Sequence, residues 1–390
     1  MSLKGAAYIA GAFEHPTRKA PDKSVALLHA ECALGALKDA GLTKDDVDGY
    51  FCAGDAPGMG PINMIDYMNL TKVRHVDATD IGGSSYLMLV AHAAEAIAAG
   101  RCNVGLITLA GRPRSEGQAT GTAARAGNPA QPDMQFEYPF GPTVANMYAM
   151  CAQRHMHQYG TTSEQLAWIK VAASTHAQYN EHALLRDVVT VEDVVKSPII
   201  ASPLHRLDCC VITDGGGALI VVKPEIARGL KRPKIKVTGM GEAPKGQFGG
   251  DVDLTFSGAR WSGAAAFEMA GVKPGDIKYA SIYDSFTITV LMQLEDLGFC
   301  EKGQGGRFVA DGNLISGVGK LPFNTDGGGL CNNHPANRGG ITKVIEAVRQ
   351  LRGEAHPKVQ VKDCGLALAH GTGGSLGTRH GSATLIMERE

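Results

Sequence analysis

The chain has 390 residues, 44% of them hydrophobic and 20% charged, and its 38 basic and 39 acidic residues give a formal net charge of −1. This even balance argues against nucleic acid or an anionic membrane surface as a partner, and no apolar stretch is long enough to span a membrane. The nine cysteines are scattered without Cys-x-x-Cys pairs. That usage predicts reduced thiols in a cytoplasmic protein and no zinc site.

The first predicted element is a strand, because Met1–Ala10 carries one lysine and a short apolar run instead of the features of a signal peptide. Further short apolar runs alternate with helical patterns along the chain, which indicates sheets that are buried on both faces. The predicted strands are Ala7–Ala12, Val104–Leu109, Gly217–Val222, Ile235–Thr238, Tyr279–Tyr283, Leu366–Ala369 and Ala383–Met387.

An internal repeat links the two ends of the chain. Residues 35–50 and 265–280 both close a helix with Ala-Gly, form a turn, and continue through Asp-Val or Asp-Ile into a strand. The glycines, Gly41 and Gly271, fit a left-handed C-cap. A second helix is expected after each copy, at Ser84–Ala99 and at Gly340–Leu351. The two halves are therefore predicted to be copies of one α/β unit, with boundaries at residues 1–230 and 231–390.

A longer segment, at about residues 111–200, interrupts the first half. It has few strand signals, and its clearest helical stretches are Val144–Tyr159 and Thr162–Glu181. An insertion inside a duplicated fold is interpreted as a substrate-facing loop domain.

Four local motifs, in this order, resemble those of thiolases. They are Thr213–Leu219 (Thr-Asp-Gly-Gly-Gly-Ala-Leu), Tyr283–Phe286 (Tyr-Asp-Ser-Phe), Asn324–Leu330 followed by Asn333–Pro335 (Asn-His-Pro), and His370–Gly374 (His-Gly-Thr-Gly-Gly). The resemblance covers essentially the whole chain. It implies the thiolase fold, which has five layers, α/β/α/β/α, formed by two similar halves with a helical loop-domain insertion, and it implies a dimer.

The reactive cysteine of thiolases is missing. Thiolases carry it at the N-terminus of the buried helix of the first half, where the helix dipole lowers its pKa. Here the corresponding stretch is Asp80–Tyr86, and counting back from Gly100 places the cysteine's position at Gly83 or Ser84. Ser84 is a conceivable replacement, but a serine hydroxyl needs an adjacent base, and its ester would discard the reactivity of the thioester.

This combination resembles a branch of lipid-transfer or sterol-carrier-type thiolase-like proteins that includes steroid side-chain retro-aldolases. Its members lack the cysteine and pair with a small protein of zinc-ribbon and OB-fold type, and residues 299–311 and 322–328 are typical of it. The resemblance implies such a partner, in a heterotetramer. Steroid-cleaving members carry a tyrosine near the Gly-His-Pro position, whereas this chain has His334, so a steroid substrate is not supported.

The resemblance implies catalytic roles for Tyr283, His334 and His370. Tyr283 ends a strand, and a phenol beside a histidine could remove the proton of a β-hydroxyl group; its ordinary role would be a half-buried aromatic. The counterpart of His334 binds the thioester oxygen, so it is expected to stabilise an enolate, although it could be a structural core histidine. His370 stands where thiolases carry a second cysteine and is either a general acid or base or an unassigned loop residue. Asp284 is predicted to be the N-cap of a helix at Ser285–Leu297.

Cys331 is the rival nucleophile, three residues from His334, and its alternative role is a small buried hydrophobe in a glycine-rich turn. Cys209 and Cys210 are interpreted as core strand residues.

Three hypotheses follow. The first is a carbon–carbon lyase that cleaves a β-hydroxyacyl-CoA without an acyl-enzyme, with coenzyme A as part of the substrate and no covalently bound cofactor. Tyr283 would be its base, His334 would stabilise the enolate, and His370 could donate a proton. The second is a thiolase acting on a β-ketoacyl-CoA, and the third is a non-catalytic scaffold subunit. No residues that contact coenzyme A can be assigned.

Overall fold

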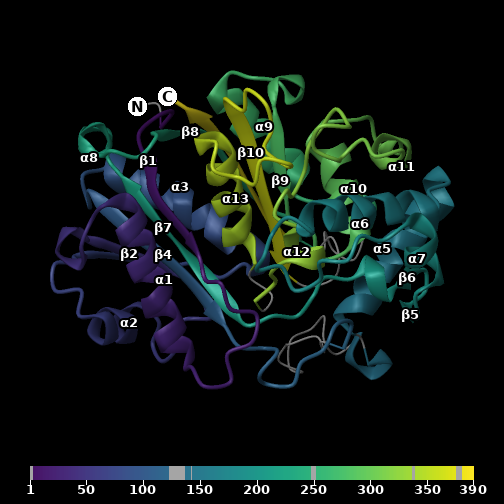
Figure 1. Cartoon of the computed structure of the whole chain (residues 1–390), viewed down its shortest axis with the longest axis horizontal. Coiled ribbons are helices and arrows are strands. Elements are labelled where there is room, and N and C mark those ends of the chain that lie inside the picture. Colours follow the sequence, from purple (N-terminus) through teal and green to yellow (C-terminus); the bar gives the residue numbers. More distant parts are fainter. Residues whose placement is uncertain (1–2, 123–136, 142, 247–251, 336–338, 375–379) are drawn as a thin grey trace.

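A computed structural model of the chain describes residues 3–122, 137–141, 143–246, 252–335, 339–374 and 380–390. Residues 123–136 of the predicted insertion therefore lie outside the described part. Within it, nine strands follow one hydrogen-bonded order (Figure 1). In that order they are β3 (His75–Ala78), β2 (Gly49–Cys52), β4 (Val104–Gly111), β7 (Gly215–Val222), β1 (Tyr8–Glu14), β8 (Ile235–Pro244), β11 (His380–Arg389), β10 (Leu366–Gly374) and β9 (Tyr279–Ile282).

The first five strands in this order come from the first half of the chain and the last four from the second half, and the pairing between these two sets is short. β1 and β8 are paired only through Tyr8 with Lys236 and Ile9 with Ile235, whereas β1–β7 and β8–β11 pair over most of their lengths. The order is mixed, because β2 is parallel to β3 and β4 while β4 and β7 are antiparallel. In the second half β11 is antiparallel to β8 and β10, while β10 is parallel to β9. Each half therefore contributes a mixed set of strands, and the two sets of described strands join only through the short pairing of β1 with β8.

The helices lie in layers around these sheets. In chain order they are α1 (Val25–Ala40), α2 (Pro61–Met68), α3 (Ser85–Ala98), α5 (Val144–Tyr159), α6 (Ser163–Ala177), α7 (Val191–Lys196), α8 (Pro224–Gly229), α9 (Ala259–Ala270), α10 (Thr287–Asp296), α11 (Gly305–Val309), α12 (Gly328–Cys331) and α13 (Gly340–Arg352). One core cluster joins α3 and α13 to strands of both halves. A second packs α1 on the outer face of the first sheet, and a third packs α9 and α10 on the outer face of the other. The layers are α/β/α/β/α, as predicted (Figure 1).

The internal repeat is present in three dimensions. α1 ends at Gly41 with φ of 71°, and α9 ends at Gly271 with φ of 70°, both in the left-handed region that glycine tolerates best. A short 3₁₀ turn then leads into β2 in one half and into β9 in the other. The predicted second helices correspond to α3 and α13.

The helices α5, α6 and α7 lie at one end of the molecule beside α10 and α11, together with a small hairpin of β5 (Ile199–Ala201) and β6 (Leu204–His205) (Figure 1). Threonine N-caps begin both long helices: Thr143 accepts a bond from the Asn146 amide and Thr162 from the Gln165 amide. None of the helices described here is long and apolar enough to cross a membrane.

Candidate active site

A cavity opens where the helical segment meets the second sheet. Its apolar wall includes Tyr148 of α5, whose ring stacks on Phe286 with centroids 4.5 Å apart. Its polar side holds Tyr283, Ser285 and His334. Residues 372–374 of β10 complete the lining. Two of the three predicted catalytic residues therefore share one cavity with an apolar wall, which is the usual composition of a small-molecule site.

Tyr283 follows β9 directly, and its backbone amide donates to the His370 carbonyl oxygen at 2.9 Å, which extends the pairing of β9 with β10. Its side chain is 3% exposed. The Oη atom lies 2.9 Å from His334 Nε2, and the two rings meet edge to face with centroids 5.6 Å apart. Burial raises the pKa of the phenol well above its ordinary value, so Tyr283 is a neutral phenol in the resting protein.

His334 lies in the loop after α12, and its backbone amide donates to Thr213 Oγ1 at 2.9 Å. Burial lowers the pKa of the imidazole to about 4, against a smaller opposing effect of the Asp284 carboxylate. Nδ1 is buried, and it has no hydrogen-bond partner among the residues that the structure describes. The pair formed by Tyr283 and His334 is therefore uncharged at neutral pH, joined by one hydrogen bond, and able to pass a proton along it.

Gly83, one of the two positions where the missing cysteine is expected, leaves no room for a side chain. A Cβ atom at this position would lie 2.4 Å from Tyr283 Cζ and 2.3 Å from the Thr372 carbonyl oxygen. Real Cβ atoms essentially never come this close to such atoms, so a side chain at position 83 and the Tyr283 ring exclude each other. The phenol fills the space that a cysteine at position 83 would need. The sequence carries no signal for this exclusion.

Ser84 ends a 3₁₀ turn, Gly82–Ser84, ahead of α3. Its side chain is fully buried, and the hydroxyl donates to the Ile81 carbonyl oxygen at 2.7 Å. A serine nucleophile needs a side-chain base to take its proton, and here that proton is directed at a backbone carbonyl. Ser84 is not part of the cavity lining.

His370 lies in β10, beside the Tyr283 backbone, but its imidazole is fully buried and is not part of the cavity lining. Nδ1 lies 2.9 Å from Thr384 Oγ1 in the paired strand β11, and that hydroxyl lies 2.9 Å from Ser262 Oγ of α9. These contacts direct the ring to the helix layer and not to Tyr283 and His334.

The prediction that Asp284 caps the following helix is wrong. α10 begins later, at Thr287, with Phe286 as its N-cap and no side-chain capping bond. Asp284 instead accepts bonds from the backbone amides of Gly329 at 2.8 Å and Leu330 at 3.1 Å. Its Oδ1 also lies 2.8 Å from Lys343 Nζ, a buried ion pair. Asp284 therefore holds the chain segment that leads to His334, a role set by tertiary contacts that sequence patterns do not contain.

Comparisons with known proteins identify the family of this chain. A model of the thiolase C-terminal domain-like family matches residues 243–389. The chain is 33% identical, over 89% of its length and 91% of the relative, to an acetyl-CoA acetyltransferase of Methanothermobacter thermautotrophicus. It is 36% identical, over 90% of its length and 91% of the relative, to a steroid side-chain-cleaving aldolase of Thermomonospora curvata. A solved structure described as an Ltp2-ChsH2(DUF35) aldolase superposes on this chain with a TM-score of 0.88 and 33% sequence identity. The match covers 99% of this chain and 98% of the solved chain.

The chain belongs to the thiolase superfamily. The predicted membership, the fold and the enzyme class are confirmed. Because these relatives of the thiolase superfamily include both an acyltransferase and an aldolase, membership alone does not decide the chemistry, and the site has to decide it.

Thiolase chemistry needs a thiolate at the substrate, so the cysteines around the site matter. Cys331 is fully buried in α12, where its Sγ accepts from Lys170 Nζ at 3.2 Å, and it is not part of the cavity lining. Burial raises its pKa even though Lys170 opposes this. Cys209 and Cys210 both line the cavity, and burial raises the pKa of both thiols. Both lie outside the strands of the described residues, so their interpretation as core strand residues is wrong. None of these three thiols is set up as a thiolate nucleophile.

Proposed function

We propose that this chain is an acyl-CoA carbon–carbon lyase that cleaves a β-hydroxyacyl-CoA thioester by a retro-aldol reaction, without an acyl-enzyme. The observation that carries the proposal is the Tyr283 phenol, which fills the space that a side chain at position 83 would need and lies 2.9 Å from the His334 imidazole. A phenol and an imidazole move protons, and that is the catalysis a retro-aldol cleavage requires.

The reaction begins with the proton of the substrate's β-hydroxyl group. Tyr283 Oη accepts this proton while its own proton passes to His334 Nε2, so that a free phenolate, which burial disfavours, never has to form. The β-carbon then becomes a carbonyl carbon, the bond between the α- and β-carbons breaks, and its electron pair becomes the enolate of the shortened thioester.

The imidazolium form of His334 stabilises this enolate and then returns the proton through Tyr283 to the α-carbon. The products are a carbonyl compound and a shortened acyl-CoA, and no proton or electron is gained or lost overall. An imidazolium in this buried place is costly, because burial holds its pKa at about 4, and the adjacent enolate charge offsets that cost in the transition state. No step requires Ser84 or His370.

Thiolysis of a β-ketoacyl-CoA is the alternative, and the similarity to an acetyl-CoA acetyltransferase favours it. With no thiolate at the cavity, coenzyme A itself would have to attack the ketone carbonyl. The two reactions differ in one requirement, because thiolysis consumes free coenzyme A and retro-aldol cleavage does not.

We also propose the assembly. β3 is the edge strand of the first sheet, with β2 as its single neighbour in the strand order, and Val76 on it is 43% exposed. Edge strands with open backbone groups invite pairing, so we place a homodimer contact there. The Ltp2-ChsH2(DUF35) aldolase supports a second subunit, and we propose that this subunit is small, is of zinc-ribbon and OB-fold type, and forms a heterotetramer with the chain. The free cysteines support a cytoplasmic location, and the helical segment at about residues 111–200, which supplies Tyr148, would form a loop domain over the acyl group.

The test supplies β-hydroxyacyl-CoA and β-ketoacyl-CoA thioesters separately, with and without free coenzyme A, to the chain and any co-purifying partner. Release of a carbonyl compound and a shortened acyl-CoA from the hydroxy substrate without added coenzyme A supports the lyase. Turnover of the keto substrate alone, dependent on coenzyme A, supports the thiolase. Turnover of neither, together with full biological function of a Tyr283→Phe variant, would point to the scaffold.

A further inference from the structure

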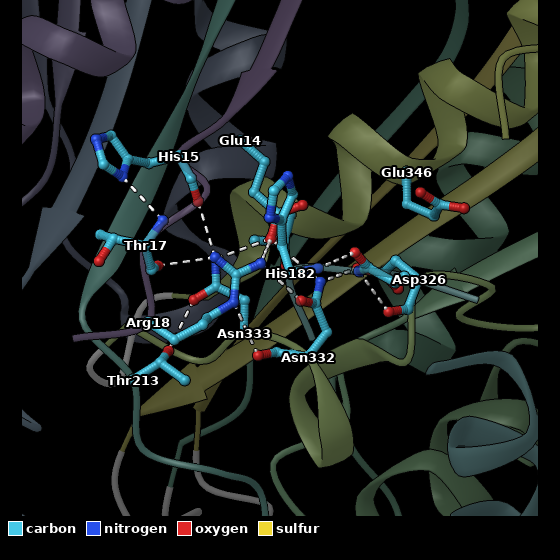
Figure 2. Close-up of polar contacts among 12 residues, drawn as sticks. Glu14, His15, Thr17, Arg18, His182, Thr213, Asp326, Asn332, Asn333 and Glu346 are labelled. Carbon is cyan, nitrogen blue, oxygen red and sulfur yellow. Dashed lines mark hydrogen bonds and ion pairs between the residues drawn. The ribbon is translucent and has the colours of Figure 1, made fainter. Parts of the chain in front are cut away.

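A charged cluster around Glu14 contacts Asn332 and Asn333, the two residues that precede His334 in the chain (Figure 2). Its centre is Glu14, at the end of β1, whose side chain is 5% exposed. Glu14 Oε1 accepts from Arg18 at 2.7 Å, from Asn333 Nδ2 at 2.9 Å and from Asn332 Nδ2 at 3.1 Å. Its other oxygen accepts from Arg349 of α13 at 3.2 Å. One carboxylate from the first half thus holds two consecutive side chains of the second half.

Those two side chains immediately precede His334 in the chain. Asn333 is held at both ends of its amide, because its nitrogen donates to Glu14 and its oxygen accepts from Thr213 Oγ1 at 2.7 Å. Thr213 in turn accepts from the His334 backbone amide at 2.9 Å. A continuous chain of hydrogen bonds therefore runs from the Glu14 carboxylate through Asn333 and Thr213 to the backbone of His334, and Figure 2 shows its first part.

The neighbouring residue, Asn332, is fixed by the same cluster. Arg18 donates to its carbonyl oxygen from Nε at 3.1 Å and to its side-chain oxygen at 2.6 Å, and its side-chain nitrogen also donates to Asp326 at 3.0 Å. Every polar atom of this side chain has a partner, so the backbone at position 332 has little freedom. The backbone that leads to His334 is therefore held rigidly by these hydrogen bonds.

Glu14 must be ionised to do this. Burial alone would raise the pKa of its carboxyl group, but the guanidinium groups of Arg18 and Arg349 outweigh burial and bring the pKa down to about 2. Without the negative charge, the buried guanidinium of Arg18 would lose its partner and lie near the partly exposed Arg349, and the amides of Asn332 and Asn333 would lose a common acceptor.

The position of the His334 ring depends on this rigid backbone because the ring makes few hydrogen bonds of its own. Nε2 contacts Tyr283, and Nδ1 has no hydrogen-bond partner within the described part of the chain. Glycines surround it: a Cβ atom at Gly329 would lie 3.2 Å from His334 Cδ2, and one at Gly339 would lie 3.4 Å from the same atom. The position of the ring against Tyr283 is therefore set mainly through its backbone.

We propose that Glu14 is a positioning residue for His334, acting through Asn333 and Thr213, and that it sets the hydrogen bond between the imidazole and the Tyr283 phenol. The kinetic part rests on the proposed function. The structural part, a change at the His334 ring when Glu14 is altered, does not.

The experiment compares Glu14→Gln, which keeps the shape of the side chain and removes its charge, with Asp39→Asn as a matched control. Asp39 is another largely buried carboxylate paired with arginines, Arg232 and Arg352, and it lies outside the candidate site. The first readout is the ¹⁵N NMR signal of the His334 imidazole, assigned by its loss in His334→Ala. We expect Glu14→Gln to shift this signal and Asp39→Asn to leave it in place, whether or not the substrate has been identified.

The second readout is turnover of a β-hydroxyacyl-CoA. A displacement of about 1 Å in a catalytic group costs about 10²-fold in rate, so Glu14→Gln should lower kcat by about 10- to 100-fold with KM nearly unchanged. In a His334→Ala background the same substitution should have little further effect, because the group that it positions is gone. An unshifted imidazole signal would overturn the proposal. So would a double variant in which the kcat loss equals the product of the losses of Glu14→Gln and His334→Ala.

Should Glu14→Gln fail to fold, the same series of hydrogen bonds is tested at Thr213, the end nearer to His334. Thr213→Val removes the hydroxyl that holds Asn333 and His334, and Thr213→Ser retains it. The proposal expects the imidazole shift and the kcat loss in the valine variant and recovery of both in the serine variant, and equal behaviour of the two variants contradicts it. If the wild-type chain cleaves no β-hydroxyacyl-CoA, the proposed function fails, and the NMR comparison still decides the role of Glu14.

Discussion

Replacing Gly83 by alanine puts a methyl group into space that Tyr283 occupies. The new Cβ would lie 2.3 Å from the Thr372 carbonyl oxygen and 2.4 Å from Tyr283 Cζ, which is about 1 Å inside ordinary contact. Relief of both contacts requires the Tyr283 ring to move and the backbone at position 83 to shift away from the β10 carbonyl. Overpacking of this kind costs about 1–3 kcal/mol of stability, and a shift of the phenol by about 1 Å should reduce kcat by about 10²-fold.

The free energy of unfolding is measured in urea, and kcat is measured with a β-hydroxyacyl-CoA. Gly229→Ala is the control, because a Cβ at Gly229 meets nothing within 4 Å, so its stability should change by less than about 0.5 kcal/mol. Full stability and full kcat in Gly83→Ala would refute the claim that Tyr283 fills the space of a side chain at position 83.

Tyr283→Phe removes only the Oη atom, and loss of a positioned acid–base group should lower kcat by about 10²- to 10⁴-fold, while a urea titration should show nearly wild-type stability. Cys210→Ala and Cys331→Ala should both retain turnover in the same assay, and abolished turnover in either would identify a nucleophile. The pKa of His334 is about 4 in the folded chain against an ordinary 6.5, so the unfolded chain binds a proton that the folded chain does not as the pH falls from 6.5 to 4. Stability should therefore fall across this window by up to about 3 kcal/mol, and a His334→Gln variant, compared by urea unfolding at pH 7 and pH 4.5, should lose less. A homodimer through β3 should sediment at twice the chain mass, and Val76→Lys should shift it towards the monomer.

Much of the fold follows from local patterns. The repeated Ala-Gly ends of α1 and α9 required left-handed residues, and Gly41 and Gly271 adopt them in the structure. The helix α5 matches its predicted range, Val144–Tyr159. β3 was not predicted, because His-Val-Asp-Ala is short and half polar, as suits a strand at a sheet edge.

The candidate site was predictable in part. The residue types and motif order predict a phenol beside a histidine, and the structure places Tyr283 Oη 2.9 Å from His334 Nε2. The exclusion between Gly83 and the Tyr283 ring depends on how α3 approaches the end of β9. The hydrogen bonds of Glu14 join residues more than 300 positions apart in the chain. Contacts of that kind leave no pattern in a single sequence.

The most direct test of the central claim is the intact mass of the protein during turnover of acyl-CoA thioesters, with short and bulky acyl groups. Retro-aldol catalysis through Tyr283 and His334 predicts an unmodified protein mass while carbonyl product accumulates from a β-hydroxyacyl-CoA. A mass increase equal to the acyl group, mapped by proteolysis to Cys210, Cys331 or Ser84, would contradict the account and establish an acyl-enzyme.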